Sequence, residues 1–160
     1  MKLLLLFVDF DGVLHDADAA QMNYDGGGVT ITGERLFSRL PLLEDLMTRM
    51  PELHIVVSSS WQHHYSPPEL ETLLGRAGPR MVGTTRSLMP PGVLPPNRFE
   101  ECQAVAVAMG ASDWILVDDQ PSLVFGNVAA SPEMMARVVF TDPMIGLTDQ
   151  TVATIEGRFT

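Results

Sequence analysis

Cysteine and lysine are nearly missing from this 160-residue chain, in which Cys102 and Lys2 are the only residues of their types. A single cysteine excludes an intrachain disulfide and a cysteine-based zinc cluster, and it fits a reducing, cytoplasmic location. Long hydrophobic runs are also missing. The apolar stretch from Lys2 to Val8 is too short for a signal peptide and ends at Asp9. No stretch is long enough to cross a bilayer, so we expect no membrane partner.

Positive charge is scarce as well, because 10 Lys and Arg residues stand against 20 Asp and Glu residues, for a formal net charge of −10. This balance argues against tight, nonspecific nucleic-acid binding, which requires basic stripes. Specific recognition of one phosphate end remains open. Part of the acidity is expected to be local, because a magnesium site concentrates carboxylates.

Three short apolar runs are present, and each ends on polar or acidic residues. Runs of this length, bounded in this way, predict buried strands of a parallel sheet. Open α/β sheets bind ligands at the carboxyl ends of their strands, so the three endings should gather at one edge. The runs and their endings are 3–8 before Asp9-Phe10-Asp11-Gly12, 53–57 before Ser58-Ser59-Ser60, and 114–117 before Asp118-Asp119.

The composition, 46% hydrophobic and 19% charged, is ordinary for a globular protein, and we expect one domain over residues 1–160. The class is α/β, with a three-layer, Rossmann-like parallel sheet and no segment long enough for a large cap. Residues 12–33 predict a small flap hairpin after the first strand. A helix is expected near 36–50, kinked or divided by Pro41. The other expected elements are helices at 67–74, 97–109 and from 148, strands at 81–83 and 137–140, and an irregular loop at 85–97.

Asp9 and Asp11 stand two residues apart at a strand end, a spacing that points both carboxylates to one side. One can attack phosphorus and form an aspartyl-phosphate, while the other protonates the leaving oxygen and then activates water. Mg²⁺ takes carboxylate, water and phosphate oxygens as ligands. The predicted metal set is Asp9, Asp11, Asp118 and Asp119, although Asp119 could instead cap the next turn.

A phosphate group also needs hydroxyl donors and a fixed cation. Ser58 is well placed to bind a phosphate oxygen, and Ser59 or Ser60 could do the same. Because the only lysine is Lys2, at the far end of the first strand, the cation must be an arginine. Arg98 is the first candidate and Arg86 its competitor.

With these motifs in order, the chain resembles the haloacid dehalogenase (HAD) superfamily of aspartate-nucleophile phosphohydrolases over residues 3–119. It is most similar to the HAD-like domains found with RNA-repair enzymes, through Ser58-Ser59-Ser60-Trp61, the 98–102 helix start, 116–119, and Thr141-Asp142 with 146–148. The resemblance implies Asp9 as nucleophile, Asp11 as general acid/base, Ser58 and Arg98 on phosphate, and Asp118 on Mg²⁺. The sequence departs from the pattern in having an arginine for the usual lysine, and Gln62 where a basic residue is expected.

Capless members of the superfamily tend to act on large substrates or to assemble so that a neighbour covers the site. We therefore expect a phosphorylated substrate, either a small molecule or a nucleic-acid end, or a homo-oligomer. A phosphotransferase or phosphomutase would use the same residues. Three other classes are less favoured. A receiver domain needs a lysine at a later strand end, which this chain lacks. A dehalogenase does not need Asp11, and a non-catalytic binding module would not need both Asp9 and Asp11.

Several other residues have less specific expectations. Adjacent loop histidines such as His63 and His64 are expected to be solvated, although they could touch substrate. His15 and Asp16 are expected to lie in the flap, where they could contact the leaving group. Trp61 is expected to pack beneath its loop, although it could stack on a base. Cys102 should be buried and inert. Asp142 is expected to be a turn residue before Pro143.

Overall fold

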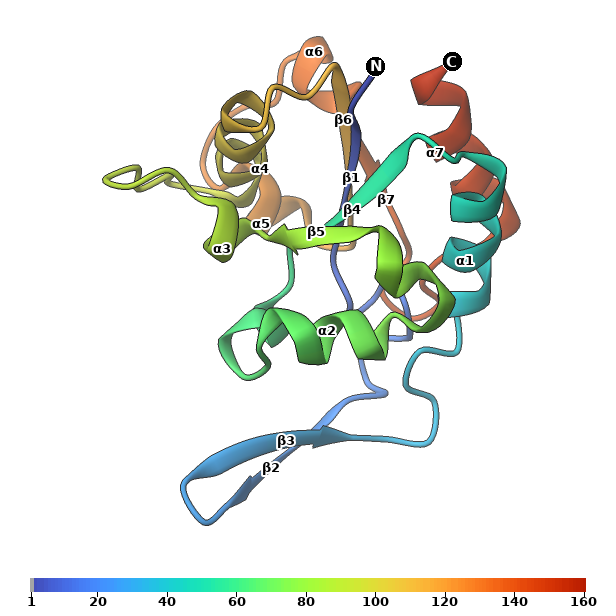
Figure 1. Cartoon of the computed structure of the whole chain (residues 1–160), viewed down its shortest axis with the longest axis vertical. Coiled ribbons are helices and arrows are strands. Elements are labelled where there is room, and N and C mark those ends of the chain that lie inside the picture. Colours follow the sequence, from blue (N-terminus) through green and yellow to red (C-terminus); the bar gives the residue numbers. More distant parts are fainter. Residues whose placement is uncertain (1) are drawn as a thin grey trace.

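The computed structural model describes residues 2–160 and has a five-stranded, all-parallel sheet at its centre (Figure 1). This confirms the α/β class. Each strand is short, and all but the edge strand β5 are buried along most of their length, as expected when both faces of a parallel sheet are covered. In sheet order, the strands are β5 (Met81–Thr84), β4 (Leu53–Val57), β1 (Leu4–Val8), β6 (Asp113–Asp118) and β7 (Val138–Phe140).

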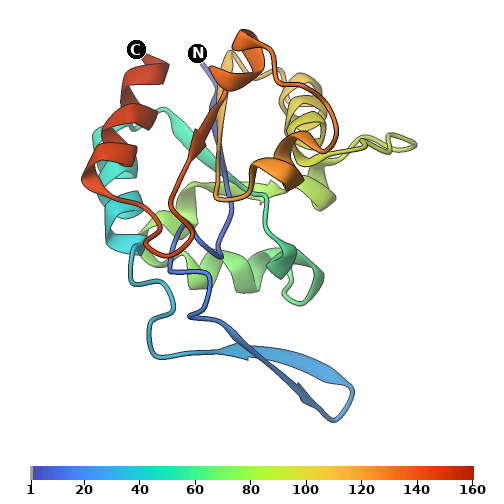
Figure 2. The ribbon, with the colours of Figure 1, turned by 180° about the vertical axis from the view of Figure 1, so that it is seen from behind.

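Helices cover both faces of the sheet, which gives the predicted three layers. The side chains of β1 alternate: Leu4, Leu6 and Val8 enter one apolar core, and Leu5 and Phe7 enter the other. The first core includes residues of α1 (Leu40–Arg49), α2 (Pro67–Leu73) and α7 (Asp149–Phe159), and the second includes residues of α4 (Arg98–Ala108) and α5 (Pro121–Phe125). Figure 2, seen from behind, shows α7 beside α1 and the orange segment with α5 on the side of α4.

The sheet order reverses direction at β1, the first strand in the chain. From β1 the chain moves outward through β4 and β5 and then returns to place β6 on the opposite side of β1. The carboxyl end of the sheet next to such a reversal is where open α/β sheets bind ligands. The candidate site is therefore expected between the ends of β1 and β6.

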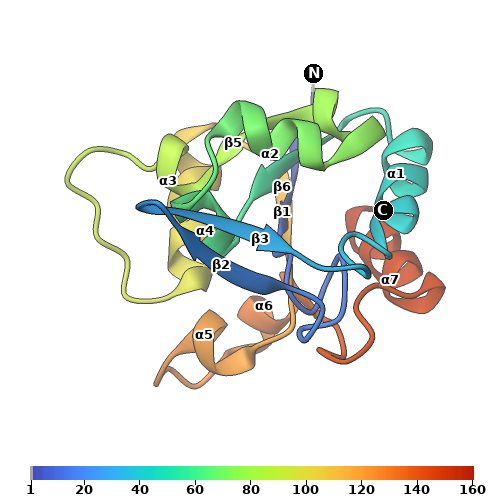
Figure 3. The ribbon, with the colours of Figure 1, turned by 90° about the horizontal axis from the view of Figure 1, so that it is seen from below.

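A two-stranded antiparallel hairpin, β2 (Gln21–Asp25) and β3 (Gly28–Thr32), projects from the end of the molecule opposite the two chain termini (Figure 1). In Figure 3, seen from below, it lies in front of the sheet. The backbone N–H of Ile31 donates to the hydroxyl of Tyr65 at 2.9 Å, which fastens the hairpin to the loop after β4. Within residues 2–160, this hairpin is the only insertion resembling a cap.

Some local predictions need correction. Pro41 does not kink or divide a helix, because α1 begins at Leu40 and the proline lies in the first turn, where its missing N–H costs no hydrogen bond. Residues 85–97 are not entirely irregular, since α3 (Thr85–Leu88) starts from a capping box formed by Thr84 and Ser87. A short helix, α6 (Pro132–Met135), had no signal strong enough to predict it.

The helix starting signals at Asn97 and Thr148 are confirmed. Asn97 accepts a hydrogen bond from the backbone N–H of Glu100, and Thr148 from that of Thr151. Within the described residues 2–160, no helix combines the length and apolar character needed to cross a bilayer.

Candidate active site

Strand register brings three predicted residues to one level at the carboxyl edge of the sheet. Val8 pairs with Val57 on one side and with Val117 on the other. The following residues, Asp9, Ser58 and Asp118, therefore leave the sheet together. The backbone ladder continues through this level, because Asp9 N–H donates to Val117 O at 3.1 Å and Ser58 N–H donates to Val8 O at 2.9 Å.

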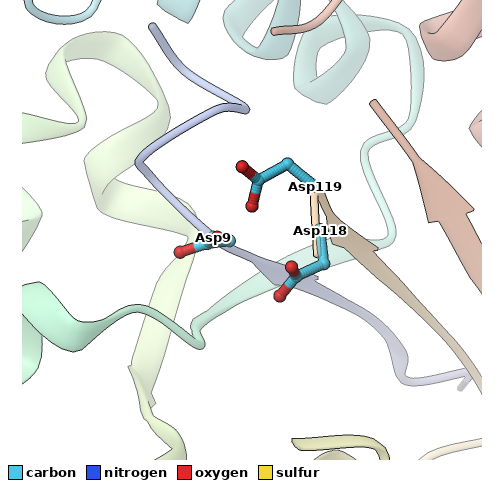
Figure 4. A group of neighbouring side chains, drawn as sticks. All are labelled: Asp9, Asp118 and Asp119. Atoms are coloured by element: carbon cyan, nitrogen blue, oxygen red, sulfur yellow. The ribbon is translucent and has the colours of Figure 1, made fainter. Parts of the chain in front are cut away.

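The carboxylates of Asp9, Asp118 and Asp119 form a buried cluster (Figure 4), with one oxygen from each lying within 4.8 Å of the others. Neither side-chain oxygen of Asp119 has a hydrogen-bond partner within residues 2–160. Asp119 therefore does not cap the next turn. Unpaired buried carboxylate oxygens are costly unless a cation satisfies them, and an all-oxygen donor set suits Mg²⁺. The residues present fit this metal.

Gly12 makes the cluster sterically feasible. It adopts φ +75°, and a Cβ built there would lie 2.1 Å from Oδ2 of Asp119. Any other residue would therefore push the carboxylate away from the site. Thr141 holds the same turn, because its hydroxyl donates to Gly12 O at 2.6 Å.

The protein environment disfavours full ionisation of the cluster. Burial raises the pKa of Asp9 well above its ordinary value, and the negative charge of Asp118 adds to the effect, against an opposing contribution from Arg98. Burial and the charge of Asp118 likewise raise the pKa of Asp119. Three carboxylates so close together repel one another, and a bound cation would remove that penalty.

Arg98 is the arginine that reaches this cluster. Its Nη1 donates to Asp118 Oδ2 at 2.6 Å and lies 3.5 Å from Asp9 Oδ2. Burial lowers the pKa of the Arg98 guanidinium, but the charges of Asp9 and Asp118 more than compensate, so that the net pKa is raised. Arg86, the competitor, has no contact with either acid within residues 2–160 and instead lies by His63.

The serines after β4 are buried beside this edge. Ser58 is 1% exposed, and its hydroxyl lies 3.9 Å from Cys102 Sγ. Ser59 accepts the backbone N–H of Trp61 and so caps the short helical turn that follows. Their roles in phosphate binding stay predictions. Cys102 is fully buried as expected, and burial raises the pKa of its thiol, which keeps it protonated.

Asp11 is not part of the three-carboxylate cluster, and its side chain is held by two partners. His15 Nε2 lies 2.8 Å from Oδ1, and Trp61 Nε1–H donates to Oδ2 at 3.2 Å. The Phe37 N–H donates to His15 Nδ1 at 3.3 Å, so the His15 proton is on Nε2 and is donated to Asp11. The role of Asp11 as a metal ligand stays a prediction.

Sequence reasoning placed His15 in the flap and expected Trp61 to pack beneath its loop or to stack on a base. Trp61 is buried as expected. His15, however, is completely buried in the turn before the hairpin, within an aromatic cluster that contains Phe10, Phe37 and Trp61. The one sequence signal for the contact between His15 and Asp11 is their four-residue spacing. Nothing in the sequence connects Trp61 to Asp11. Asp142 lies in a turn, where its Oδ1 accepts the Met144 N–H, as predicted.

An open cleft of about 570 Å³ adjoins Arg98. Its polar lining includes Gln62, His63 and Arg86, and its apolar lining comes from Met89, residues 93–96 and Leu123. Of the three residues that gather at the acidic edge with Arg98, namely Asp9, Asp118 and Asp119, none lines this cleft, so Arg98 is the residue that connects the two.

The strand order and the acidic edge define a phosphate-handling domain of the HAD type. A family model described as the HAD domain in Swiss Army Knife RNA repair proteins matches residues 5–152, and the chain belongs to this family. The predicted resemblance is thereby confirmed.

Comparison with other known proteins adds little. Among curated proteins, none matches this chain. Among solved structures, a hypothetical protein from Xanthomonas campestris shares 17% identity, with 98% of this chain and 82% of the other covered and a TM-score of 0.47. This similarity is too weak to carry a functional argument.

Proposed function

We propose that this domain is a magnesium-dependent phosphomonoester hydrolase that works through an aspartyl-phosphate. The observation that carries the proposal is the cluster of Asp9, Asp118 and Asp119, with two unpartnered carboxylate oxygens and Arg98 beside it. A purely structural role would not explain why a fold buries three mutually repelling acids together. Membership in the HAD family supports the same conclusion.

In the first step, an Asp9 oxygen attacks the phosphorus atom. A P–O bond to Asp9 forms as the P–O bond to the leaving group breaks. Asp11 gives its proton to the departing oxygen, which leaves as an alcohol. His15 and Trp61 hold the Asp11 carboxyl in the orientation that this transfer requires.

In the second step, water attacks the aspartyl-phosphate. Asp11, now a carboxylate, removes a proton from the water as the new P–O bond forms and the bond to Asp9 breaks. Inorganic phosphate leaves, and both acids return to their starting states. Arg98 and the Ser58 hydroxyl are assigned to the phosphate oxygens, where they offset the developing negative charge.

Asp9, Asp118 and Asp119 would hold the Mg²⁺ ion, with Asp11 as a further predicted ligand. When bound, the metal supplies positive charge that lets an anionic phosphate approach anionic carboxylates. The finer proposal for the substrate is a nucleotide or the phosphorylated end of a polynucleotide. Its support is the RNA-repair context of the family and the open cleft beside Arg98.

The direct test is hydrolysis of p-nitrophenyl phosphate with and without Mg²⁺, for the wild type and for Asp9→Asn. We expect turnover that needs Mg²⁺ and that disappears in the variant, since an amide is a very poor nucleophile. Asp45→Asn is the matched control, because Asp45 is an exposed acid on α1 with only a long ion pair to Arg76. This control should retain full activity.

A selective enzyme could ignore this artificial substrate, so a second measurement is needed. Beryllium fluoride with Mg²⁺ mimics the phosphorylated aspartate, and we expect it to raise the melting temperature of the wild type but not of Asp9→Asn. Failure of both measurements in the wild type would contradict the catalytic proposal and favour a binding module.

A further inference from the structure

Arg86 is an arginine of the cleft beside Arg98 that has no acidic or carbonyl partner within residues 2–160. In a chain of net charge −10, most arginines are neutralised within the fold. Within residues 2–160, Arg39 and Arg86 have neither kind of partner. The other arginines either form ion pairs (Arg35, Arg49, Arg76, Arg98 and Arg137) or donate to backbone carbonyls (Arg80 and Arg158).

The position of Arg86 is fixed by the loop that carries the predicted phosphate-binding serines. Gln62, four residues after Ser58, accepts the Arg86 backbone N–H at 2.9 Å and donates to the Thr85 hydroxyl at 3.1 Å. The Arg86 guanidinium lies 3.4 Å from His63 Nδ1 on the same loop. Arg86 and His63 are exposed, and both line the cleft that Arg98 also lines. Gln62, which departs from the family pattern, thus has a structural role in placing a cation.

The remaining cleft residues indicate what else a ligand must offer. Leu94 is 93% exposed, and with Val93 and Leu123 it adds apolar surface to the same cleft. Glu101 is an acid that also faces the cleft, where it can accept a hydrogen bond from a hydroxyl group. A ligand with a second anionic group, hydroxyl groups and an apolar or planar body would match the cationic residues, Glu101 and the apolar lining of the cleft.

We propose that Arg86 and His63 form a second anion subsite, which selects phosphomonoesters whose leaving group carries another phosphate. The reacting phosphate binds at Asp9 and Arg98, and the second phosphate binds at Arg86, farther along the same cleft. The second phosphate is either a monoester, as in a nucleoside bisphosphate, or the adjacent diester of a short oligonucleotide. This inference rests on the proposed function and specifies its substrate.

The test compares three substrates: a nucleoside 5′-monophosphate, a nucleoside 3′,5′-bisphosphate and a 5′-phosphorylated dinucleotide. We expect kcat/KM for the two substrates that carry a second phosphate group to exceed kcat/KM for the monophosphate on the order of tenfold, which is the usual size of one charge-assisted contact. In Arg86→Gln the ratio should fall to about one, and the wild-type ratio should shrink as salt is added. Arg76→Gln, which removes an equal charge from an exposed position outside the cleft, should keep the wild-type ratio.

The outcomes separate this inference from the proposed function. If the wild type hydrolyses p-nitrophenyl phosphate but shows no preference for a second phosphate, the subsite is wrong and the hydrolase stands. A preference restricted to phosphopeptides with acidic neighbours would also overturn it. If nothing is hydrolysed, calorimetric binding of the bisphosphate to Asp9→Asn with Mg²⁺ decides, since Arg86→Gln in that background must weaken binding for the subsite to hold.

Discussion

Gly12 is the residue on which the approach of Asp119 to Asp9 depends. We expect Gly12→Ala to abolish Mg²⁺-dependent turnover and to destabilise the protein by more than the about 1–2 kcal/mol cost of the left-handed conformation alone, because the new Cβ would overlap Asp119. Urea unfolding and hydrolysis measure the two effects. Gly110→Ala is the control: Gly110 has φ +66° with nothing within 4 Å of its Cβ position, so this variant bears only the conformational cost.

In the proposed mechanism His15 acts through Asp11, and this gives it a distinctive signature. p-Nitrophenolate leaves without a proton, whereas an alkoxide needs one from Asp11. We therefore expect His15→Phe, which removes the bond to Asp11 Oδ1, to reduce kcat for an alkyl phosphate about tenfold or more beyond its effect on p-nitrophenyl phosphate.

Two companion variants test this interpretation of His15. Trp61→Phe removes the bond to the other Asp11 oxygen and should show the same dependence on the leaving group. His64→Phe, at an exposed position, should show none. An equal loss on both substrates in His15→Phe would mean that the histidine matters only for folding.

Residues that leave strand ends can be found from the sequence, because an apolar run followed by an acid fixes where a side chain emerges. The meeting of Asp9, Asp118 and Asp119 therefore follows from the strand endings alone. The partners of Asp11 were not predictable in the same way. Trp61 is 50 residues from Asp11 along the chain, and only the packing of the loop after β4 against the turn after β1 brings them together.

At the scale of elements, the β2–β3 hairpin is the segment least integrated into the fold. β2 is exposed along its whole length, and the Ile31 bond to Tyr65 is one of its few ties to the body. We expect Tyr65→Phe to raise the rate of proteolytic cleavage within residues 21–32 several-fold with little change in melting temperature, because local opening needs no global unfolding. Mass spectrometry locates the cuts. Tyr24→Phe, whose hydroxyl contacts only Met22 within the hairpin, should leave the rate unchanged.

Element types were predicted well, and element boundaries less so. The capping signal at Asn97 located the start of α4, and the structure adds that Thr148, at the expected start of α7, also caps the backbone three residues later. Pro41 was misjudged because a proline carries the same sequence signal in the first turn of a helix as in its middle. Which of the two applies depended on Phe37, whose φ of +58° ends the preceding segment before α1 begins.

At the scale of the whole molecule, the buried acids make metal-free folding less favourable. Asp119→Asn removes one of three repelling charges. We expect the variant in EDTA to be more stable than the wild type by about 1 kcal/mol, or about 2–4 °C in melting temperature. Its response to Mg²⁺ should be much smaller. Calorimetry in EDTA and in Mg²⁺ measures both, and a wild-type-like response to Mg²⁺ would remove Asp119 from the metal site. The exposed Asp45→Asn should behave as the wild type does.

The same acids make the response to Mg²⁺ depend on pH. Their raised pKa values mean that the metal-free fold holds protons more tightly than the unfolded chain does, so stability from this source is present at low pH and is lost as pH rises through those values. Mg²⁺ needs the deprotonated acids, so its affinity changes in the opposite sense. The shift in melting temperature produced by Mg²⁺ should therefore grow as the pH rises from the ordinary carboxyl range through the raised pKa values of these acids. A shift independent of pH would contradict this.

The central position of β1 also affects the order in which the sheet can assemble during synthesis. β1 is made first, but its neighbour β6 follows it by roughly a hundred residues, since Leu4 pairs with both Leu53 and Asp113. At about 5–20 residues per second, one edge of this wholly apolar strand waits on the order of ten seconds during synthesis for its partner. The ending that β6 brings, Asp118-Asp119, completes the acidic cluster. β6 thus covers the second edge of β1 and delivers two of the three clustered acids in one late event, and a nascent chain that has not reached β6 lacks most of the candidate metal site.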